Sequence, residues 1–124
     1  MFFLKPTSSY LTQPGSIEQP EGVDLHHEIE LGVIIGKTGR DIPIKDASSY
    51  VSGYVLALDM TARNIQAEAK KKGAPWTVAK GFDTFTPVGE FLPPDSIKDT
   101  KNLRLQLTVS CMNMLFFLKK SSKQ

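Results

Sequence analysis

Apolar and polar residues alternate along two segments of the chain. The segments 29–35 (IELGVII) and 103–109 (LRLQLTV) carry an apolar side chain at every second position. Because successive side chains of a strand point to opposite faces, each segment is predicted to form a strand with one apolar face. The segment 50–58 (YVSGYVLAL) is β-branched and aromatic, which favours a buried strand that places Asp59 at its carboxyl end.

A helical segment follows Asp59. Residues 61–72 (TARNIQAEAKKK) are predicted to form the main helix, with Thr61 as its N-cap and Gly73 as its C-cap. Lys70–Lys72 then fall in the last turn, where positive charge complements the helix dipole.

Shorter segments give weaker signals. Residues 46–50 are predicted to form a short helix, and residues 2–5 and 76–80 are predicted to form short strands. Two stretches, 13–24 and 87–102, are rich in turn-forming residues and are predicted to be loops.

Composition narrows the class of protein. The chain has 124 residues, which fits one domain, and 15 Lys+Arg against 13 Asp+Glu give a net charge of only +2. So small an excess does not indicate nucleic-acid or membrane binding, and no apolar run approaches the length of a membrane span. The start, MFFLKPTSSY, lacks the features of a secretory signal or an Arg-rich transit peptide. A single cysteine, Cys111, excludes an internal disulfide and favours a reducing compartment.

The composition changes abruptly near residue 110. The segment SCMNMLFFLKKSSKQ begins with an apolar run and ends as a basic, polar tail. We therefore expect a domain over residues 1–109 and a divergent tail over residues 110–124.

Carboxylates are the first candidate chemistry. Glu28 and Glu30 lie two residues apart in the predicted strand, so both side chains leave the same face. Such a pair is commonly a solvated face, but here apolar residues flank it and Asp59 ends another buried strand. Oxygen donors at strand positions suit Mg²⁺, Mn²⁺ or Ca²⁺ better than zinc.

Two histidines precede these carboxylates and raise zinc as an alternative. His26 and His27 are neighbours, so at most one of them can share the carboxylate face, and parity selects His26. The spacing of His27 and Glu30 is a helical ligand pattern within a predicted strand. Zinc is therefore the weaker interpretation, and His26 is expected to support the site or the core rather than bind metal.

Basic and amide side chains allow two interpretations each. Lys80 and Lys5 could form structural salt bridges, or they could place an ammonium beside a substrate carboxylate or a developing enolate. Arg63 and Gln66 lie three apart on one helix face, where Arg63 could pair with a nearby carboxylate. Spacing alone favours the structural interpretation of both.

Four ordered runs carry a family resemblance. FLKPTSSY, LHHEIELGVIIG, GYVLALDMTARNIQ and KKKGAPWTVAKGFDTFTPVG together resemble the fumarylacetoacetate hydrolase superfamily, in particular its acylpyruvase branch. The resemblance covers about residues 2–109. It implies a β-rich α+β fold, a mixed β-roll like the C-terminal domain of that family, with one main helix near 61–72. It also implies assembly as a homodimer.

The resemblance also implies an activity. Family members bind Mg²⁺ or Mn²⁺ and act on small 2-oxo acids: they cleave acylpyruvates, decarboxylate oxaloacetate or interconvert its keto and enol forms. Each reaction passes through an enolate of a metal-chelated 2-oxo acid. We accordingly expect a small-molecule substrate, neither nucleic acid nor membrane as partner, and a mitochondrial or cytoplasmic location.

Site residues follow by matching motifs. Glu28, Glu30 and Asp59 match the family's metal ligands. Lys80 matches the catalytic, substrate-binding lysine after P-W-T-x-A, and the two further substrate-binding residues are Lys5 and Gln66.

The chain also departs from the family pattern. The G-R-N-Y-x-x-H motif that precedes F-L-K-P and the G-T-P-x-G-V-G loop beyond the last strand have no counterpart in the sequence. We therefore expect a family domain shortened at both ends. One alternative is a catalytically inactive isoform that pairs with full-length protomers or is unstable. Another is a basic nucleic-acid module, based on Lys70–Lys72 and the tail.

Overall fold

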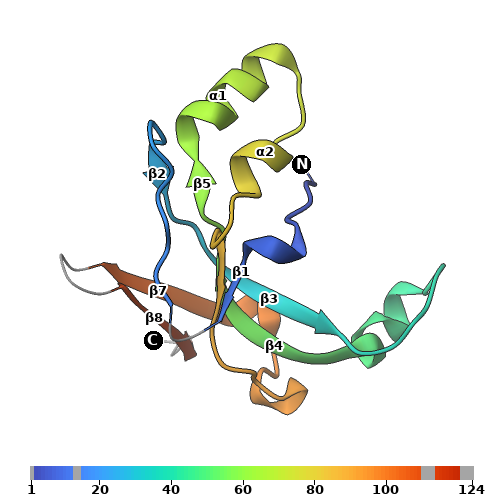
Figure 1. Cartoon of the computed structure of the whole chain (residues 1–124). Coiled ribbons are helices and arrows are strands. Elements are labelled where there is room, and N and C mark those ends of the chain that lie inside the picture. The colour runs from blue at the N-terminus through green and yellow to red at the C-terminus, as the bar shows by residue number, and fades with distance from the viewer. Residues whose placement is uncertain (1, 13–14, 110–113, 121–124) are drawn as a thin grey trace. The chain divides into compact units, whose positions relative to one another are not determined.

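The structure is a computed structural model that describes residues 2–12, 15–109 and 114–120, the last range by its backbone alone. The chain divides into two compact units. Figure 1 shows the strands and the α-helices along the chain. Unit 1 comprises Met1–Glu30 and Ala57–Gly89, and unit 2 comprises Leu31–Leu56 and Glu90–Gln124. Strands β3 (Ile29–Ile35) and β4 (Val51–Leu58) continue from one unit into the other.

Unit 1 contains paired strands of both orientations. Its remaining elements are the 3₁₀-helix η1 (Thr7–Ser9), the strands β1 (Tyr10–Thr12), β2 (Leu25–His26), β5 (Thr61–Ala62) and β6 (Thr86–Val88), and the helices α1 (Arg63–Lys72) and α2 (Thr77–Lys80). Strand β6 pairs parallel with β1 and antiparallel with the end of β4. A second, two-stranded ladder joins β2 to β5. The sheet order is β1-β6-β4-β3, so the predicted mixed sheet is confirmed.

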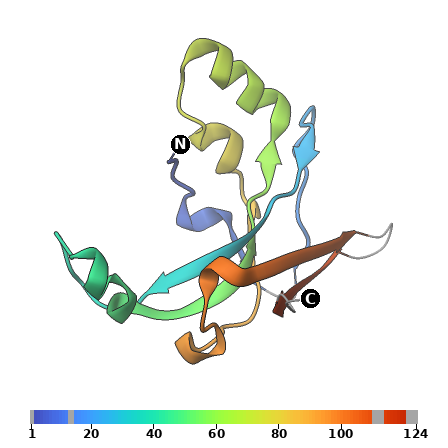
Figure 2. The same cartoon turned by 180° about the vertical axis from the view of Figure 1, so that it is seen from behind.

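The main helix confirms one of its two predicted caps. Gly73 ends α1 in the left-handed conformation, with φ of 63°, and its N–H bonds back to the last-turn carbonyls. The prediction of Thr61 as N-cap is wrong, because Thr61 belongs to β5 and Ala62 occupies the N-cap position without a side-chain cap. Helix α1 packs against α2 and β5 within unit 1 (Figure 2).

The apolar core of unit 1 surrounds the junction of β4, β5 and α2. Leu58, Met60, Ala62, Ala79 and Phe85 are each at most 1% exposed. Polar side chains are also buried in this core, where they need hydrogen-bond partners because water is excluded. Within the described residues, every buried side-chain nitrogen and oxygen has a hydrogen-bond partner.

Unit 2 contains the remaining parts of β3 and β4 and a hairpin. Its other elements are the 3₁₀-helices η2 (Ile44–Tyr50), η3 (Pro94–Ser96) and η4 (Thr100–Asn102) and the strands β7 (Leu103–Val109) and β8 (Met114–Lys120). Strands β7 and β8 pair antiparallel, from Leu103 opposite Lys120 to Val109 opposite Met114. The predicted strand at 103–109 and the short helix ending at Tyr50 are confirmed.

Several predictions differ from the structure. Residues 2–5 form no strand, and the Lys5 side chain bonds instead to Asp59 and to the Lys80 carbonyl. The predicted strand at 76–80 is wrong: α2 occupies it, with the Lys80 N–H bonded to the Trp76 carbonyl at 3.1 Å. On the apolar face of β3, Ile29 and Leu31 are partly buried, whereas Val33 and Ile35 are 50% and 65% exposed.

Some predictions fall outside the described residues. Cys111 lies among residues 110–113, and residues 121–124 are likewise outside, so the divergent tail at 110–124 stays a prediction. None of the helices in the described part of the chain has the length and apolar character that a bilayer span requires.

Candidate functional site

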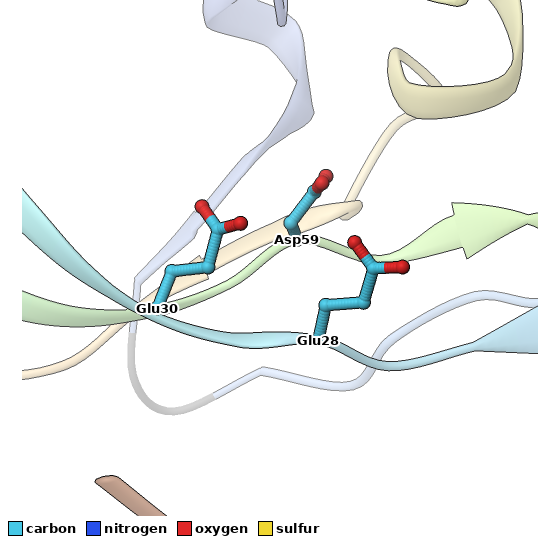
Figure 3. A group of neighbouring side chains, drawn as sticks. All are labelled: Glu28, Glu30 and Asp59. Carbon is cyan, nitrogen blue, oxygen red and sulfur yellow. The ribbon is translucent and has the colours of Figure 1, made fainter. Parts of the chain in front are cut away.

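Three carboxylates of unit 1 converge on one point. Glu28 immediately precedes β3, Glu30 lies within it, and Asp59 follows the last residue of β4. One carboxylate oxygen of each residue lies within 4.8 Å of the others, and the three side chains point into the same space (Figure 3). The Asp59 N–H bonds to the Glu28 carbonyl at 2.8 Å, so backbone pairing sets the distance between the two segments.

Two lysines approach these carboxylates. The Lys80 ammonium donates hydrogen bonds to Glu28 Oε2 at 2.9 Å, to Asp59 Oδ2, and to Thr61 Oγ1 at 2.7 Å. Lys80 is only 1% exposed. The Lys5 ammonium donates to Asp59 Oδ1 at 2.6 Å and to the Lys80 carbonyl at 2.6 Å. Both predicted lysines therefore belong to the carboxylate cluster.

Helix α1 adds a guanidinium and an amide. Arg63 Nη2 donates to Glu28 Oε1 at 2.6 Å, and its Nη1 donates to Gln66 Oε1 at 2.5 Å. Gln66 is buried, while the Arg63 side chain is 32% exposed. The predicted helix-face pair is confirmed, and Arg63 fixes the orientation of the Gln66 amide because its fork holds one donor on each partner.

Burial and neighbouring charges shift the pKa values of three side chains in the site. Burial lowers the pKa of Lys5 from its usual value, against the opposing effect of its bond to Asp59. Burial alone would raise the pKa of Glu28, but hydrogen bonds from Arg63 and Lys80 outweigh it and hold that pKa below its usual range. The pKa of Glu30 is raised, first by partial burial and then by the Asp59 charge. Glu30 is thus the acidic member with the least compensation.

The donor set fits a hard divalent cation. Its ligand atoms are all carboxylate oxygens, which suit Mg²⁺ or Mn²⁺, and their mutual distances allow one ion to contact all three residues. The ammonium groups of Lys5 and Lys80 compete for oxygens of the same acids.

The histidines lie outside this acidic set. His26 Nε2 lies 3.5 Å from Asp24 Oδ2, and both side chains are about half exposed or more. His27 is exposed as well. This placement agrees with the interpretation that the histidines are not metal ligands. His26 was also expected to support the site or the core, and its exposed position does not agree with that expectation.

Two neighbours of Lys80 were missed from the sequence. Thr61 accepts its hydrogen bond, and the Phe3 ring centroid lies 4.9 Å from its ammonium nitrogen. The signal for Thr61 is its position two residues after Asp59 in extended chain, which places both side chains on one side. Phe3 lies two residues before Lys5, but no local sequence pattern indicates that Phe3 or Lys5 contacts Lys80.

An apolar groove lies beside Lys5 in unit 1. Its volume is about 640 Å³, and Leu4, Pro6, Val78 and Phe82 line it together with Lys5. The three carboxylates are absent from the described lining of this groove. The groove is therefore a neighbour of the charged cluster rather than part of it.

Comparison with known proteins gives a consistent result. The family model for the fumarylacetoacetate (FAA) hydrolase C-terminal domain matches residues 1–114. A Dictyostelium discoideum protein named "Oxaloacetate decarboxylase, mitochondrial" is 61% identical over 110 residues, which cover 87% of this chain and 50% of the relative. An Arabidopsis thaliana protein named "Oxaloacetate tautomerase FAHD1, mitochondrial" is 56% identical over 110 residues, covering 88% and 49%.

A solved structure shares the fold. Fumarylpyruvate hydrolase from Pseudomonas aeruginosa, in complex with Mn²⁺ and pyruvate, aligns with a TM-score of 0.77 and 34% identity. The alignment covers 87% of this chain and 48% of that one. The chain thus spans about half the length of the curated relatives it matches. With a family match over residues 1–114 and the predicted mixed sheet with few helices in place, the chain belongs to the fumarylacetoacetate hydrolase family.

Proposed function

We propose that this chain is a divalent-metal-dependent enzyme that acts on small 2-oxo acids. Oxaloacetate, through decarboxylation or keto–enol tautomerisation, is the first candidate substrate, and acylpyruvates, through C–C bond hydrolysis, are the second. The observation that carries the proposal is the convergence of Glu28, Glu30 and Asp59 beside the buried Lys80 ammonium. The names of the two relatives support the choice of oxaloacetate.

The acidic cluster would hold Mg²⁺ or Mn²⁺. The Mn²⁺ and pyruvate in the related hydrolase support a divalent cation and a 2-oxo acid here. Bound by Glu28, Glu30 and Asp59, the cation would supply Lewis acidity to the carbonyl of a chelating substrate.

The remaining residues would bind and orient the substrate. Lys80 places a fixed positive charge beside the carboxylates, where it would stabilise negative charge that develops on the substrate. Lys5 and the Gln66 amide would contact the substrate's acid groups. Arg63 would hold Glu28 and Gln66 at a constant separation, because it bonds to both.

The proposal extends to location and assembly. The names of both relatives include "mitochondrial", which supports a mitochondrial location for this chain rather than the cytoplasmic alternative. We also propose that the chain forms a homodimer.

The inactive isoform remains a second candidate, favoured by the coverage of only about half of each relative. In this version the chain keeps the acidic cluster but pairs with full-length protomers instead of turning over substrate. Both versions predict cation binding, and they differ in turnover.

A thermal melt tests the cation site. Mn²⁺ with oxalate, a small dicarboxylate that resembles a 2-oxo acid, should raise the melting temperature of the chain, and a chelator should reverse the rise. Glu30→Gln should abolish the response, because it removes one ligand charge. Glu68→Gln is the matched control: Glu68 lies on α1, exposed, and pairs with Lys71 at 2.7 Å.

Turnover separates the two versions. Loss of oxaloacetate and of acetylpyruvate is followed with Mn²⁺ and with chelator, and the larger kcat/KM identifies the preferred substrate. A raised melting temperature with chelator-sensitive turnover supports the enzyme. A raised melting temperature without turnover supports the inactive isoform. An unchanged melting temperature, or turnover that survives the chelator, contradicts the metal site.

A further inference from the structure

We propose that Thr61 is the positioning residue that holds the Lys80 ammonium in the site. The inference rests on the proposed function, in which Lys80 acts on the substrate. Lys80 Nζ donates a hydrogen bond to Thr61 Oγ1 at 2.7 Å. Thr61 has no exposed surface and Lys80 only 1%, so water cannot replace this bond without entering the core.

Thr61 differs in kind from the other partners of Lys80. An ammonium has three N–H donors, and among the described residues its acceptors are the carboxylates of Glu28 and Asp59 and the Thr61 hydroxyl. The two carboxylates belong to the acidic set that the proposed function assigns to the cation. Thr61 is neutral and stands outside that set. Its bond to Lys80 therefore does not compete with cation binding.

The Thr61 hydroxyl is itself oriented. It donates its proton to the Asp59 carbonyl at 3.1 Å, which directs its lone pairs toward Lys80. The residue lies in β5, where it pairs with His26 of β2, and a β-branched side chain has few χ1 alternatives. Backbone pairing and the stiff Thr61 side chain therefore fix the position of the acceptor oxygen.

Other contacts complete the enclosure of Lys80. The Lys80 ammonium nitrogen lies over the Phe3 ring, 4.9 Å from the ring centroid. The Lys80 backbone carbonyl accepts a hydrogen bond from the Lys5 ammonium at 2.6 Å. Both ends of the residue are therefore fixed. Removing the Thr61 acceptor would leave one buried N–H donor with no partner, which is costly enough to shift the ammonium.

Nitrogen-15 NMR of the lysine ammonium groups tests the proposal in the full chain. A buried, fully bonded ammonium exchanges its protons slowly, so Lys80 should give a resolved signal, assigned by its loss in Lys80→Met. Thr61→Val keeps the shape and removes the acceptor. It should speed proton exchange on the order of tenfold or more, or eliminate the signal, while Thr61→Ser should retain it.

Thr86→Val is the matched control. Thr86 is also a buried threonine of unit 1, but its hydroxyl pairs with Ser9 Oγ at 2.6 Å. This variant should leave the Lys80 signal unchanged. If Thr61→Val does not fold, Thr61→Ala takes its place with the same expectation. An unchanged signal in the Thr61 variants, or an equal loss in Thr86→Val, would overturn the proposal.

Kinetics add a second measurement. Thr61→Val should lower kcat for oxaloacetate far more than it changes KM or Mn²⁺ affinity, and Thr61→Ser should restore kcat. Equal losses in Mn²⁺ affinity and kcat would indicate a general structural role and contradict positioning. The ammonium signal does not depend on turnover. If the Thr61 variants change that signal as expected but the wild type gives no Mn²⁺–oxalate response, the proposed function is contradicted while the Thr61–Lys80 contact is supported.

Discussion

Glu30 stands apart from the other residues of the acidic cluster. Glu28 and Asp59 receive hydrogen bonds from lysine or arginine donors, whereas Glu30 interacts through charge alone among the described residues. Its carboxylate lies beside Asp59, and burial together with that charge raises its pKa. Glu30 is thus the acid of the cluster that receives no hydrogen bond from a basic side chain among the described residues.

A pH-dependent stability follows from the Glu30 pKa. A raised pKa means that the folded state binds the Glu30 proton more tightly than the unfolded state. The free energy of unfolding should therefore fall as the pH rises from the usual glutamate value of 4.5 through the raised pKa. Glu28, whose pKa is lowered, acts oppositely: its contribution is present above the usual value and is lost as the pH falls through its folded pKa.

Glu30→Gln isolates the first of these effects. In the presence of chelator this variant should be more stable than the wild type at neutral pH, because its amide stays uncharged. The difference should shrink as the pH falls below the usual glutamate value, where Glu30 of the wild type also becomes neutral. Urea unfolding across this pH range measures it. A variant that is less stable at neutral pH, or a difference that grows on acidification, would contradict the charge assignment.

Helices α1 and α2 together carry three polar side chains of the site. Arg63 and Gln66 extend from α1, and Lys80 from the last residue of α2. Between the helices the Lys70 ammonium lies over the Trp76 ring at 4.9 Å, and Trp76 packs against Phe3 with ring centroids 6.2 Å apart. A change at the end of α1 should therefore reach α2 and the N-terminal segment.

The C-cap of α1 at Gly73 gives a prediction at the scale of this element. Its φ of 63° lies in the left-handed region, and an added Cβ would meet no atom within 4 Å. Gly73→Ala should therefore lose about 1 kcal/mol from backbone conformation alone. Chemical denaturation measures the loss. Gly73→Asn serves as the control and should lose less, because asparagine tolerates this conformation better. An alanine variant as stable as the wild type would show that the cap contributes little.

At the scale of the whole molecule, strand β3 carries two exposed apolar side chains. This strand stands last in the described sheet order, and Val33 and Ile35 point to one face of it with 50% and 65% exposure. Terminal strands with apolar side chains readily associate with another chain. This feature supports the proposed self-association and indicates which strand takes part.

The double substitution Val33→Lys with Ile35→Lys should weaken self-association. Sedimentation velocity across a range of concentrations should show dimers or larger species for the wild type and monomers for the variant. Ile44→Lys is the control: Ile44 is 96% exposed but lies in η2, and its substitution should leave the assembly unchanged. A wild type that stays monomeric throughout would contradict the prediction, and so would a double variant that associates equally.

Local sequence was sufficient wherever neighbouring residues supply the structural signal. The strand β4, the end of α1 at Gly73 and the strand β7 were predicted because periodicity and caps depend on residues a few positions apart. Strand parity also predicted that Glu28 and Glu30 share one face, and Asp59 was a candidate because it ends a second predicted buried strand. The family motifs then matched all three acids to metal ligands. The same approach gave a wrong prediction for segment 76–80, because its strand-favouring residues form a helix in the tertiary structure.

By itself, then, the sequence determined the main helix, the principal strands, the family resemblance and the candidate acids. Only the tertiary structure decided which polar groups meet: Lys5 reaches Asp59 across 54 residues, and Lys80 reaches Thr61 across 19. Tertiary packing also made Thr61 an acceptor in the core instead of a helix cap. The physical reason is that a buried ammonium needs hydrogen-bond acceptors from segments that are distant in the sequence. No local sequence pattern indicates which of these segments lie close together.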